Sequence, residues 1–452
     1  MPQYRKPNPD AQAPLPYDGP SAEEILALRQ EYLMPNHMLY YKKPVAIVQG
    51  DMQYLYDTEG RQYLDAIAGI VTISVGHSNP RVLEKAIEQM KLLQHTTTIY
   101  LHPLIVTYAK MLADKMPSPA LKQTFFTNSG SEANDMALLA SILTTGNQDI
   151  LSIRNGYHGG SRITMSLCGH STWRYPVAAQ PNIHHVLPGY CYRCPLKLEY
   201  PSCNIACAHD VENVILSATC GQVAAFIAEP IQGVGGTVVP PPEYFKIIYD
   251  IVKKHGGLFI SDEVQTGFGR TGSSYWGIQN WDVEPDIMTM AKGIGNGIPL
   301  GAVTSSAKIA APLKDRYFFN TFGGNPVSMA QGIATLEEID EQGLQENCAR
   351  IGTRLMEGLE RLQSQYPLIG EVRGMGLMIG VELVTSRENR EPASAAAAEV
   401  LELAKDAGLL IGKGGLYGNV LRIKPPMCIT ENDADFILEA LDGCFKQLGA
   451  TK

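Results

Sequence analysis

The middle of this 452-residue chain alternates short apolar runs with segments of helical periodicity. Most of the runs are continuous rather than alternating in hydrophobicity, which is typical of strands covered by helices on both faces. One helical segment opens at Pro242, ends in Lys253 and Lys254, and stops at Gly256. We expect strands at 122–128, 149–155, 223–231, 257–265, 286–292 and 301–306. The alternation predicts an α/β fold with a mostly parallel sheet.

The two ends of the chain have a different character. Residues 53–67 have the pattern of a β-hairpin, and the C-terminal third combines long helical patterns, interrupted at Gly343, with further strands. A chain of this length is too long for one simple core. We predict a large domain at 76–330, a smaller α+β domain built from 21–75 and 331–452, and an extended arm at 1–20.

Composition excludes several classes of protein. The net charge of −9 and the pI near 5.6 argue against non-specific nucleic-acid binding. Charged residues interrupt every apolar stretch before the roughly 18 residues that a membrane span needs. The first 20 residues contain six prolines and match neither a signal peptide nor a transit peptide. We therefore expect a cytoplasmic protein without membrane or nucleic-acid partners.

Nine cysteines are present, an odd number that does not suggest a disulfide framework in a large chain. Four of them have C-x2-C and C-x3-C spacing, which allows a small structural zinc site. The segment between the pairs is short for such a site. We favour free thiols in a proline-rich surface segment over zinc. The four residues are Cys191, Cys194, Cys203 and Cys207.

The stretch "FFTNSGSEANDMALLA" joins an expected strand to an expected helix. Ser129 and Glu132 have the spacing of a capping box. Free backbone N–H groups at such a helix start suit a phosphate, although an ordinary capped helix has the same pattern.

The stretch "FISDEVQTGFGRTG" places Asp262 and Glu263 at the end of an apolar strand. Its "GFGRTG" matches the glycine fingerprint of nicotinamide-dependent dehydrogenases. A helix should follow those glycines, but "SSYWGIQNWD" has poor helical periodicity. We therefore reject the dinucleotide interpretation.

Lys292 follows an apolar run and precedes three glycines at alternate positions. Lys292 and Asp262 each end a predicted strand, and the ends of parallel strands meet in one crevice. A desolvated lysine there can act as a Schiff-base amine, and an aspartate can hold a pyridine nitrogen protonated. With a phosphate cradle, these are the parts that pyridoxal phosphate (PLP) requires. A surface lysine is the alternative for Lys292 alone.

The motifs "NSGSEAN", "GYHG", "AEPIQG", "SDEVQTGFGRTG", "MAKGIGNGIPLGAV" and "TFGGNP" resemble those of the class III, or ω-type, PLP-dependent aminotransferases of fold type I. The resemblance runs from about Tyr40 to the C-terminus. "GIVTISVGHSNP", "FNTFGGNP" and "RGMGLMIGVEL" are similar to the alanine–glyoxylate aminotransferase 2-like group.

The resemblance implies that Lys292 forms the Schiff base and moves a proton between substrate and cofactor, while Asp262 pairs with the pyridinium nitrogen. It further implies that Val264 and Tyr157 contact the two faces of the cofactor ring. Gln265 would reach the phenolic oxygen, and Gly130 and Ser131 would bind the phosphate. A plain core position for Val264 and an ordinary loop aromatic for Tyr157 are the alternatives.

Three further roles follow from the resemblance. Arg422 would hold the substrate carboxylate, and Glu229 would pair with Arg422 when no second carboxylate is bound. Thr321 would reach the phosphate of a neighbouring subunit, which implies a homodimer with shared active sites, or a tetramer of two such dimers. Arg422 in a structural ion pair and Glu229 as a turn cap are the alternatives.

The sequence thus predicts a PLP-dependent aminotransferase with ping-pong kinetics. The donor would be alanine, β-alanine or another ω-amino acid, and the acceptor glyoxylate or pyruvate. A phospho-lyase or a racemase on the same scaffold is the alternative, and a zinc-containing binding protein is a remote one.

Overall fold

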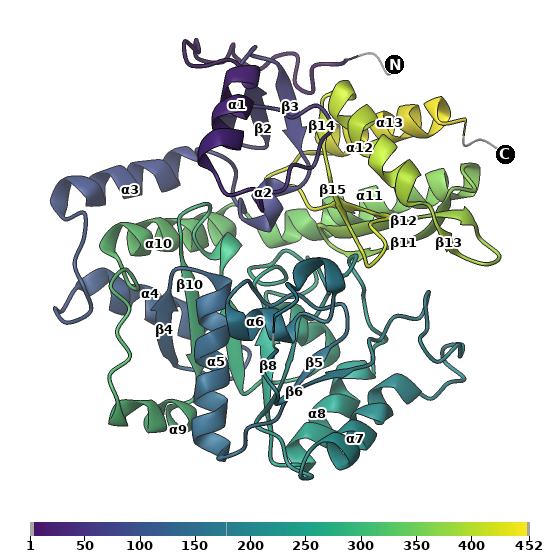
Figure 1. Cartoon of the computed structure of the whole chain (residues 1–452). Helices are drawn as coiled ribbons and strands as arrows, with labels where there is room; N and C mark the ends of the chain where they lie inside the picture. The colour runs from purple at the N-terminus through teal and green to yellow at the C-terminus, as the bar shows by residue number, and fades with distance from the viewer. Residues whose placement is uncertain (1–3, 178, 450–452) are drawn as a thin grey trace.

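The computed structural model describes residues 4–177 and 179–449. The middle of the chain forms the lower part of the molecule in Figure 1, and the two chain ends lie together above it. This arrangement agrees with a small domain built from both ends. The exact boundaries at residues 75 and 330 stay predictions.

In the described chain, the central sheet has seven strands in the order β4-β10-β9-β8-β7-β5-β6. Strand β10 is antiparallel to β4 and β9, and the other neighbouring pairs are parallel. The mostly parallel sheet and its six predicted strands are confirmed. The strands are β4 Gln123–Thr127, β5 Ile150–Ile153, β6 Ile183–Val186, β7 Ala225–Ala228, β8 Leu258–Asp262, β9 Ile287–Met290 and β10 Gly301–Ser305.

The helices between residues 68 and 310 are α2 Ala68–Val71, α3 Pro80–Leu92, α4 Pro103–Lys115, α5 Gly130–Thr145, α6 Arg162–Leu167, α7 Ala206–Ala218, α8 Tyr244–Lys254 and α9 Ala307–Ala310. Short 3-10 helices lie at η1 Ser171–Trp173, η2 Gly277–Trp281, η3 Lys292–Ile294 and η4 Ala311–Asp315. The helix expected between Pro242 and Gly256 is confirmed as α8.

Helices cover both faces of the central sheet. Ala225 and Ile227 of β7 pack in one core with α5, whereas Phe226 and Ala228 pack in another core with α7 and α8. Successive side chains of a strand point to opposite faces. Both faces are therefore buried, which explains why these strands are apolar at every position. Figure 1 shows α5 in front of the sheet.

Two smaller sheets belong to the chain ends. The hairpin of β2 and β3 is confirmed, and β14 adds to β3 in parallel, so the C-terminal part completes a sheet begun at the N-terminus. The first sheet has the strand order β1 Ile47–Asp51, β2 Tyr54–Asp57, β3 Gln62–Asp65 and β14 Leu409–Leu410. The second has the order β11 Ile369–Met375, β12 Met378–Ser386, β16 Val420–Ile423 and β15 Gly412–Gly414, and β13 Glu391–Pro392 pairs with β12.

The remaining helices are α1 Ala22–Tyr32, α10 Pro326–Glu341, α11 Leu344–Gln365, α12 Ser394–Ala407 and α13 Glu431–Gln447. Helices α11 and α12 pack on these two sheets, α13 packs on α11 and α12, and α10 packs against α3 and α4. The interruption predicted at Gly343 is confirmed, because Gly343 has a left-handed φ of 59° between α10 and α11. None of the described helices is long and apolar enough to cross a membrane.

The segment from residue 4 to residue 20 has no helix or strand, and the arm at 1–20 stays a prediction. It lies against the small domain. The backbone N–H of Arg5 donates to Ala407 at 3.4 Å, and the Tyr4 hydroxyl donates to the carbonyl of Gln62 at 3.2 Å.

Candidate active site

One cavity lies where the carboxyl ends of β8 and β9 meet the start of α5 and the loop after β5. Its lining contains eight of the ten residues for which the sequence predicts a role: Gly130, Ser131, Tyr157, Glu229, Asp262, Val264, Gln265 and Lys292. Thr321 and Arg422 do not line this cavity. The parallel sheet thus brings residues together that lie up to 162 positions apart in the sequence.

Chemistry rather than size distinguishes this cavity, whose volume is about 180 Å³. A larger depression of about 720 Å³ lies at the starts of α11 and α13, with Glu346, Arg350 and Glu431 in its lining. That lining contains neither a lysine nor a histidine. It therefore lacks both a Schiff-base amine and the usual proton-transfer group.

Lys292 stands directly after β9 and Ala291, at the first position of η3. Its φ is 52°, a left-handed value that is uncommon for a residue with a side chain and is frequent at functional sites. Within the described chain its amine makes no ion pair. Burial lowers the pKa of Lys292 to about 8, although Glu229 and Asp262 favour the charged form. The amine is therefore easily deprotonated near neutral pH.

Asp262 ends β8 and is held by three donors. His158 Nδ1 lies 2.7 Å from Oδ2, Asn134 Nδ2 donates to Oδ2 at 2.9 Å, and the N–H of Val264 donates to Oδ1 at 3.2 Å. Burial disfavours a charged His158, but the hydrogen bond to Asp262 outweighs it and raises the pKa of the imidazole. Oδ1 is left with acceptor capacity for a group in the cavity.

His158 and Asn134 were not predicted as site residues. Both stand inside motifs that were recognised, "GYHG" and "SGSEAN". Their positions as polar residues within motifs that follow strands could have marked both as candidate site residues. Their contacts with Asp262 depend on the fold.

The start of α5 forms the predicted anion site. The Ser129 hydroxyl accepts from the N–H of Glu132 at 3.2 Å and caps the helix. The capping box is incomplete, because the Glu132 carboxylate accepts from Asn128 at 2.6 Å instead of from Ser129. The N–H groups of Gly130 and Ser131 make no hydrogen bond within the described chain. They are free for a phosphate.

Two glycines keep this end of the cavity open. A Cβ on Gly130 would lie 3.2 Å from a methyl of Val264. Gly159 has a φ of 136°, and its Cβ would lie 2.3 Å from the Ser131 hydroxyl oxygen. Side chains at either position would therefore crowd the residues that face the cavity.

The middle of the cavity is lined by Val264, Tyr157 and Gln265. The ring of Tyr157 packs edge-on against Trp173, with 5.2 Å between ring centroids, which fixes its orientation. Gln265 Oε1 accepts a hydrogen bond from Lys424 Nζ at 3.2 Å. Lys424 is a second cation beside the site that sequence reasoning missed.

The structure does not show the predicted pairing of Glu229 with Arg422, which stays a prediction. Glu229 accepts from the N–H groups of Tyr157 and Gly233, both at 3.0 Å, so both of its oxygens already have donors. This is the turn-capping alternative. Burial raises the pKa of the Glu229 carboxyl.

Arg422 makes no ion pair with the residues that the structure describes, so a structural ion pair is excluded there. Its Nη2 donates to the Tyr40 hydroxyl at 2.7 Å, and its Nη1 donates to the Gly233 carbonyl at 3.4 Å. Its Nε is buried without a partner among the described residues. A guanidinium with an unused donor beside the cavity suits a carboxylate.

Thr321 is exposed on the segment between η4 and α10. It does not reach the cavity of its own chain. A role at this cavity would require a second subunit.

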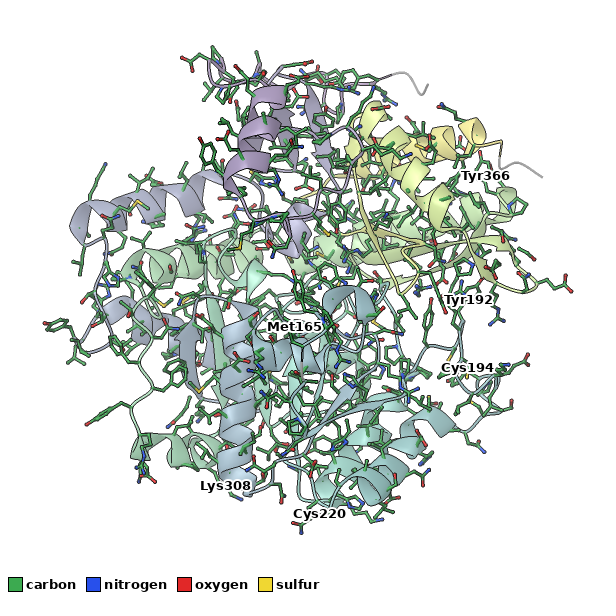
Figure 2. All side chains as sticks on the ribbon, viewed as in Figure 1. Met165, Tyr192, Cys194, Cys220, Lys308 and Tyr366 are labelled. Atoms are coloured by element: carbon green, nitrogen blue, oxygen red, sulfur yellow. The ribbon has the colours of Figure 1, made fainter. Side chains whose placement is uncertain are left out.

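The four clustered cysteines lie on the long loop before α7 and at the start of that helix. Figure 2 shows Tyr192 and Cys194 on this loop at the edge of the molecule. All four are free thiols, Cys191 is exposed and the other three are partly buried. Among the described residues, no group of three or more His, Cys, Asp or Glu side chains could hold a metal ion.

The dinucleotide alternative also fails in the structure. The glycines of "GFGRTG" are followed by turns and by η2, not by an α-helix. Glu263 instead ties this segment together, because its carboxylate accepts from the N–H groups of Gly277 and Ile278 at 2.8 and 2.9 Å.

The cavity fits PLP in three independent respects. Free N–H groups at the start of α5 suit its phosphate, and the available oxygen of Asp262 suits its ring nitrogen. The amine of Lys292, with its lowered pKa, suits its aldehyde.

Comparisons with known proteins agree with this site. Residues 39–445 match the family model described as "Aminotransferase class-III". The chain is 50% identical over 434 residues to alanine–glyoxylate aminotransferase 2 homolog 2, mitochondrial, from Arabidopsis thaliana, covering 96% of this chain and 90% of that protein. It is 40% identical over 451 residues to alanine–glyoxylate aminotransferase 2, mitochondrial, from Homo sapiens, covering 95% and 88%.

Solved structures give the same result. An aminotransferase from Bacillus anthracis superposes with a TM-score of 0.88 at 31% identity, covering 94% of this chain and 98% of that one. A phospholyase from Arthrobacter in complex with phosphoethanolamine superposes with a TM-score of 0.87 at 33% identity, covering 93% and 99%.

The names of the relatives also correct one prediction. The proteins from A. thaliana and H. sapiens are named as mitochondrial, so the prediction of a cytoplasmic protein is contradicted. Composition and the lack of a recognisable targeting pattern carried no information on the compartment. The family itself is clear: the chain belongs to the class III aminotransferases and is a PLP-dependent transaminase.

Proposed function

We propose that this transaminase moves the amino group of alanine, β-alanine or another ω-amino acid to glyoxylate or pyruvate in two half-reactions. The observation that carries the proposal is Lys292, an amine with a lowered pKa in a cavity with a phosphate cradle and a fixed carboxylate. The relatives named as alanine–glyoxylate aminotransferases support alanine and glyoxylate as the first pair to test.

Bound PLP supplies an electron sink that makes a proton on the donor carbon acidic. Lys292 is the residue that would bind the cofactor and then take up and return this proton. Burial increases the neutral fraction of its amine near pH 7 to 8, and only the neutral amine can act as a nucleophile or as a base. Glu229 and Asp262 favour the protonated form, so both forms are accessible.

Asp262 would hold the ring nitrogen in its protonated state. His158 and Asn134 both contact Oδ2, which leaves Oδ1 for this contact. Three protein donors also keep the carboxylate from rotating. The geometry supports the assignment because it fixes the direction of the acceptor.

Arg422 would bind the carboxylate of the donor or acceptor. Its partners are neutral oxygens of Tyr40 and Gly233, which a carboxylate can replace without breaking an ion pair. Glu229 would remain on its backbone donors during this exchange. The alternative that Glu229 swings to Arg422 would cost two hydrogen bonds from Tyr157 and Gly233.

A homodimer completes the proposed site. Exposed apolar side chains lie on α3, on α4 and the residues before it, and on the segment that contains Thr321. Figure 1 shows these three segments at its left. Contiguous exposed apolar surface is typical of protein interfaces, and Thr321 within it would reach the phosphate of the partner's cofactor. The residues are Leu83, Ile87, Met90, Ile99, Tyr100, Leu101, Val106, Tyr317, Phe318, Phe319 and Phe322.

The dimer has a direct test. We expect light scattering to give the mass of two chains, or of four if two dimers pair. The Leu101→Asp variant should shift the mass toward one chain and weaken PLP binding, whereas Leu216→Asp, on α7 outside this surface, should change neither. A monomeric wild-type protein that binds PLP normally would contradict the shared site.

A phospho-lyase is the second candidate, because the Arthrobacter phospholyase shares this fold. Such an enzyme would release inorganic phosphate from phosphoethanolamine. Transaminases do not produce phosphate from this substrate, so a phosphate assay separates the two activities.

The test of the proposed function is the visible absorption of the purified protein with PLP, before and after L-alanine is added without an acceptor. We expect a yellow band that bleaches with alanine and returns when glyoxylate is added. A yellow protein that alanine does not bleach would move the search to ω-amines and phosphorylated amines. A colourless protein would overturn the role of Lys292.

A further inference from the structure

Lys424 is a buried cation to which the preceding sections give no role. It follows β16, and its backbone N–H donates to the carbonyl of Ala66 at 2.7 Å, which ties it to the segment after β3. Its side chain points away from solvent and is fully buried. Both chain ends therefore fix the position of its amine.

The amine of Lys424 contacts only neutral groups. Nζ donates to Gln265 Oε1 at 3.2 Å and lies 3.5 Å from the Gly233 carbonyl. It makes no ion pair with any residue in the described ranges. A buried cation without a carboxylate is costly, and an apolar residue would be more stable at a purely structural position.

The charges around Lys424 come from four segments. Burial lowers its pKa well below the usual lysine value, and three cations that face it, Arg422, Lys292 and Arg270, lower it further. Glu229 is the carboxylate that opposes this effect. The amine is thus part of the electrostatic environment of the cavity.

Lys424 also determines how the Gln265 side chain is oriented. In the structure Lys424 Nζ donates to Oε1, so the amide oxygen of Gln265 faces Lys424 and the amide nitrogen lies on the other side. The amide packs closely against the backbone of Gly233, because a Cβ on Gly233 would lie 2.3 Å from Gln265 Nε2 and 2.4 Å from Oε1. Gln265 lines the cavity, and its Nε2 makes no hydrogen bond among the described residues.

We propose that Lys424 is a positioning residue that holds the amide of Gln265 with its NH2 end turned toward the phenolic oxygen of the cofactor. This inference rests on the proposed cofactor contact of Gln265. A fixed N–H donor stabilises the deprotonated phenolic oxygen. Without Lys424 the amide can turn over and present its oxygen instead, which would repel that form.

The test uses the holoenzyme without substrate. The visible absorption of the bound cofactor is followed from pH 5 to pH 10 in the wild type and in Lys424→Met. We expect the midpoint of the colour change to rise by about one pH unit in the variant, the size of one lost hydrogen bond to a charged group. Lys424→Leu should give the same shift and serves where the methionine variant does not fold.

A double-mutant cycle separates positioning from a general structural effect. Gln265→Ala should shift the midpoint in the same direction, and Lys424→Met combined with Gln265→Ala should add nothing further. Lys424→Arg keeps a donor and should recover at least half of the shift. Shifts that add in the double variant would mean that Lys424 acts independently of Gln265, and would overturn the proposal.

The outcomes also separate this inference from the proposed function. A wild-type protein that gains no visible band with PLP overturns the proposed function and the inference together. A normal band whose midpoint is unchanged in Lys424→Met overturns the inference alone.

Discussion

Two groups of buried charges in this molecule follow opposite rules. Around Arg373 every charge has an opposite partner: its guanidinium pairs with Glu371 and with Glu382, the latter at 2.7 Å. Glu382 also accepts from Tyr190 and pairs with Arg193. The two positive charges of the arginines and the two negative charges of the glutamates in this group therefore balance.

Around Lys292 the charges do not cancel. Four cations, Lys292, Lys424, Arg422 and Arg270, lie near two carboxylates, Glu229 and Asp262. The carboxylates are held by backbone N–H groups, Asn134 and His158, so the cations have no ion-pair partner among the residues described.

The difference indicates which group serves the fold and which serves a ligand. Breaking a buried ion pair leaves an uncompensated charge and is strongly destabilising. Buried charges without partners are instead common at functional sites. The second group contains more basic than acidic side chains, which suits an anionic cofactor and carboxylate substrates.

The largest expected effect is on catalysis. Lys292→Ala should reduce transamination of alanine by a factor on the order of 10⁴ or more, because the amine acts as both nucleophile and base. Its yellow band with PLP should also disappear. Lys405→Ala is the matched control, since Lys405 is buried but paired with Glu402 at 2.7 Å. The Lys405→Ala variant should lose stability and keep the wild-type rate. A Lys292→Ala protein that still turns over alanine would contradict the catalytic role of the unpaired group.

The largest expected effect on stability lies in the paired group. Arg373→Met should lower the free energy of unfolding by about 3–5 kcal/mol, because the partly buried Glu371 loses its cation and the buried Glu382 is left with Arg193 alone. Urea unfolding measures this loss. Arg354→Met removes an exposed pair with Asp435, at 2.7 Å, and should cost less than about 1 kcal/mol. Equal losses in the two variants would show that burial does not distinguish these ion pairs.

Arg422→Met tests the unpaired group in the same way. Its free energy of unfolding should change by less than about 1 kcal/mol, because no ion pair is broken. Its kcat/KM for alanine should fall about 10- to 100-fold, the value of a hydrogen-bonded charge pair of about 1.5–3 kcal/mol. An amine donor without a carboxylate should lose little. A large loss of stability would mean that Arg422, like Arg373, stabilises the fold.

Much of the fold could be predicted because local patterns determine it. The continuous apolar runs gave six of the strands in the central sheet, and the break at Gly343 is local as well. Strand β6 was missed because its sequence, "IHHV", contains two histidines and is short. The antiparallel direction of β10 was not predictable, since it depends on pairing with β4, which is distant in sequence.

The site divides in the same way. Residues inside motifs at strand ends, such as Lys292 and Asp262, could be located from the sequence. Contacts between distant segments could not, including Lys424 with Gln265, 159 residues apart, and Arg422 with Tyr40, 382 residues apart. The backbone donors that hold Glu229 in this structure could not be predicted either, because no side-chain pattern reveals them.

The smallest expected effect concerns the pH dependence of stability. Burial lowers the pKa of Lys292 to about 8 in the folded protein, against about 10.4 in an unfolded chain. Between these values the unfolded chain binds more protons, so the contribution of Lys292 to stability rises with pH. Below pH 8 both states are protonated and the destabilisation is complete.

Cofactor-free protein shows this effect, because bound PLP consumes the amine. At pH 7, Lys292→Met should be more stable than the wild type by about 1–3 kcal/mol, and the gap should close as the pH rises from about 8 to 10.5. The stability gap between the wild type and Arg373→Met should stay constant over that range, because arginine and glutamate do not titrate there. Urea unfolding at pH 7, 8.5 and 10 measures both gaps. If the Lys292 gap is independent of pH, the amine is not desolvated, and the contrast between paired and unpaired buried charges would apply to Arg422 and Lys424 alone.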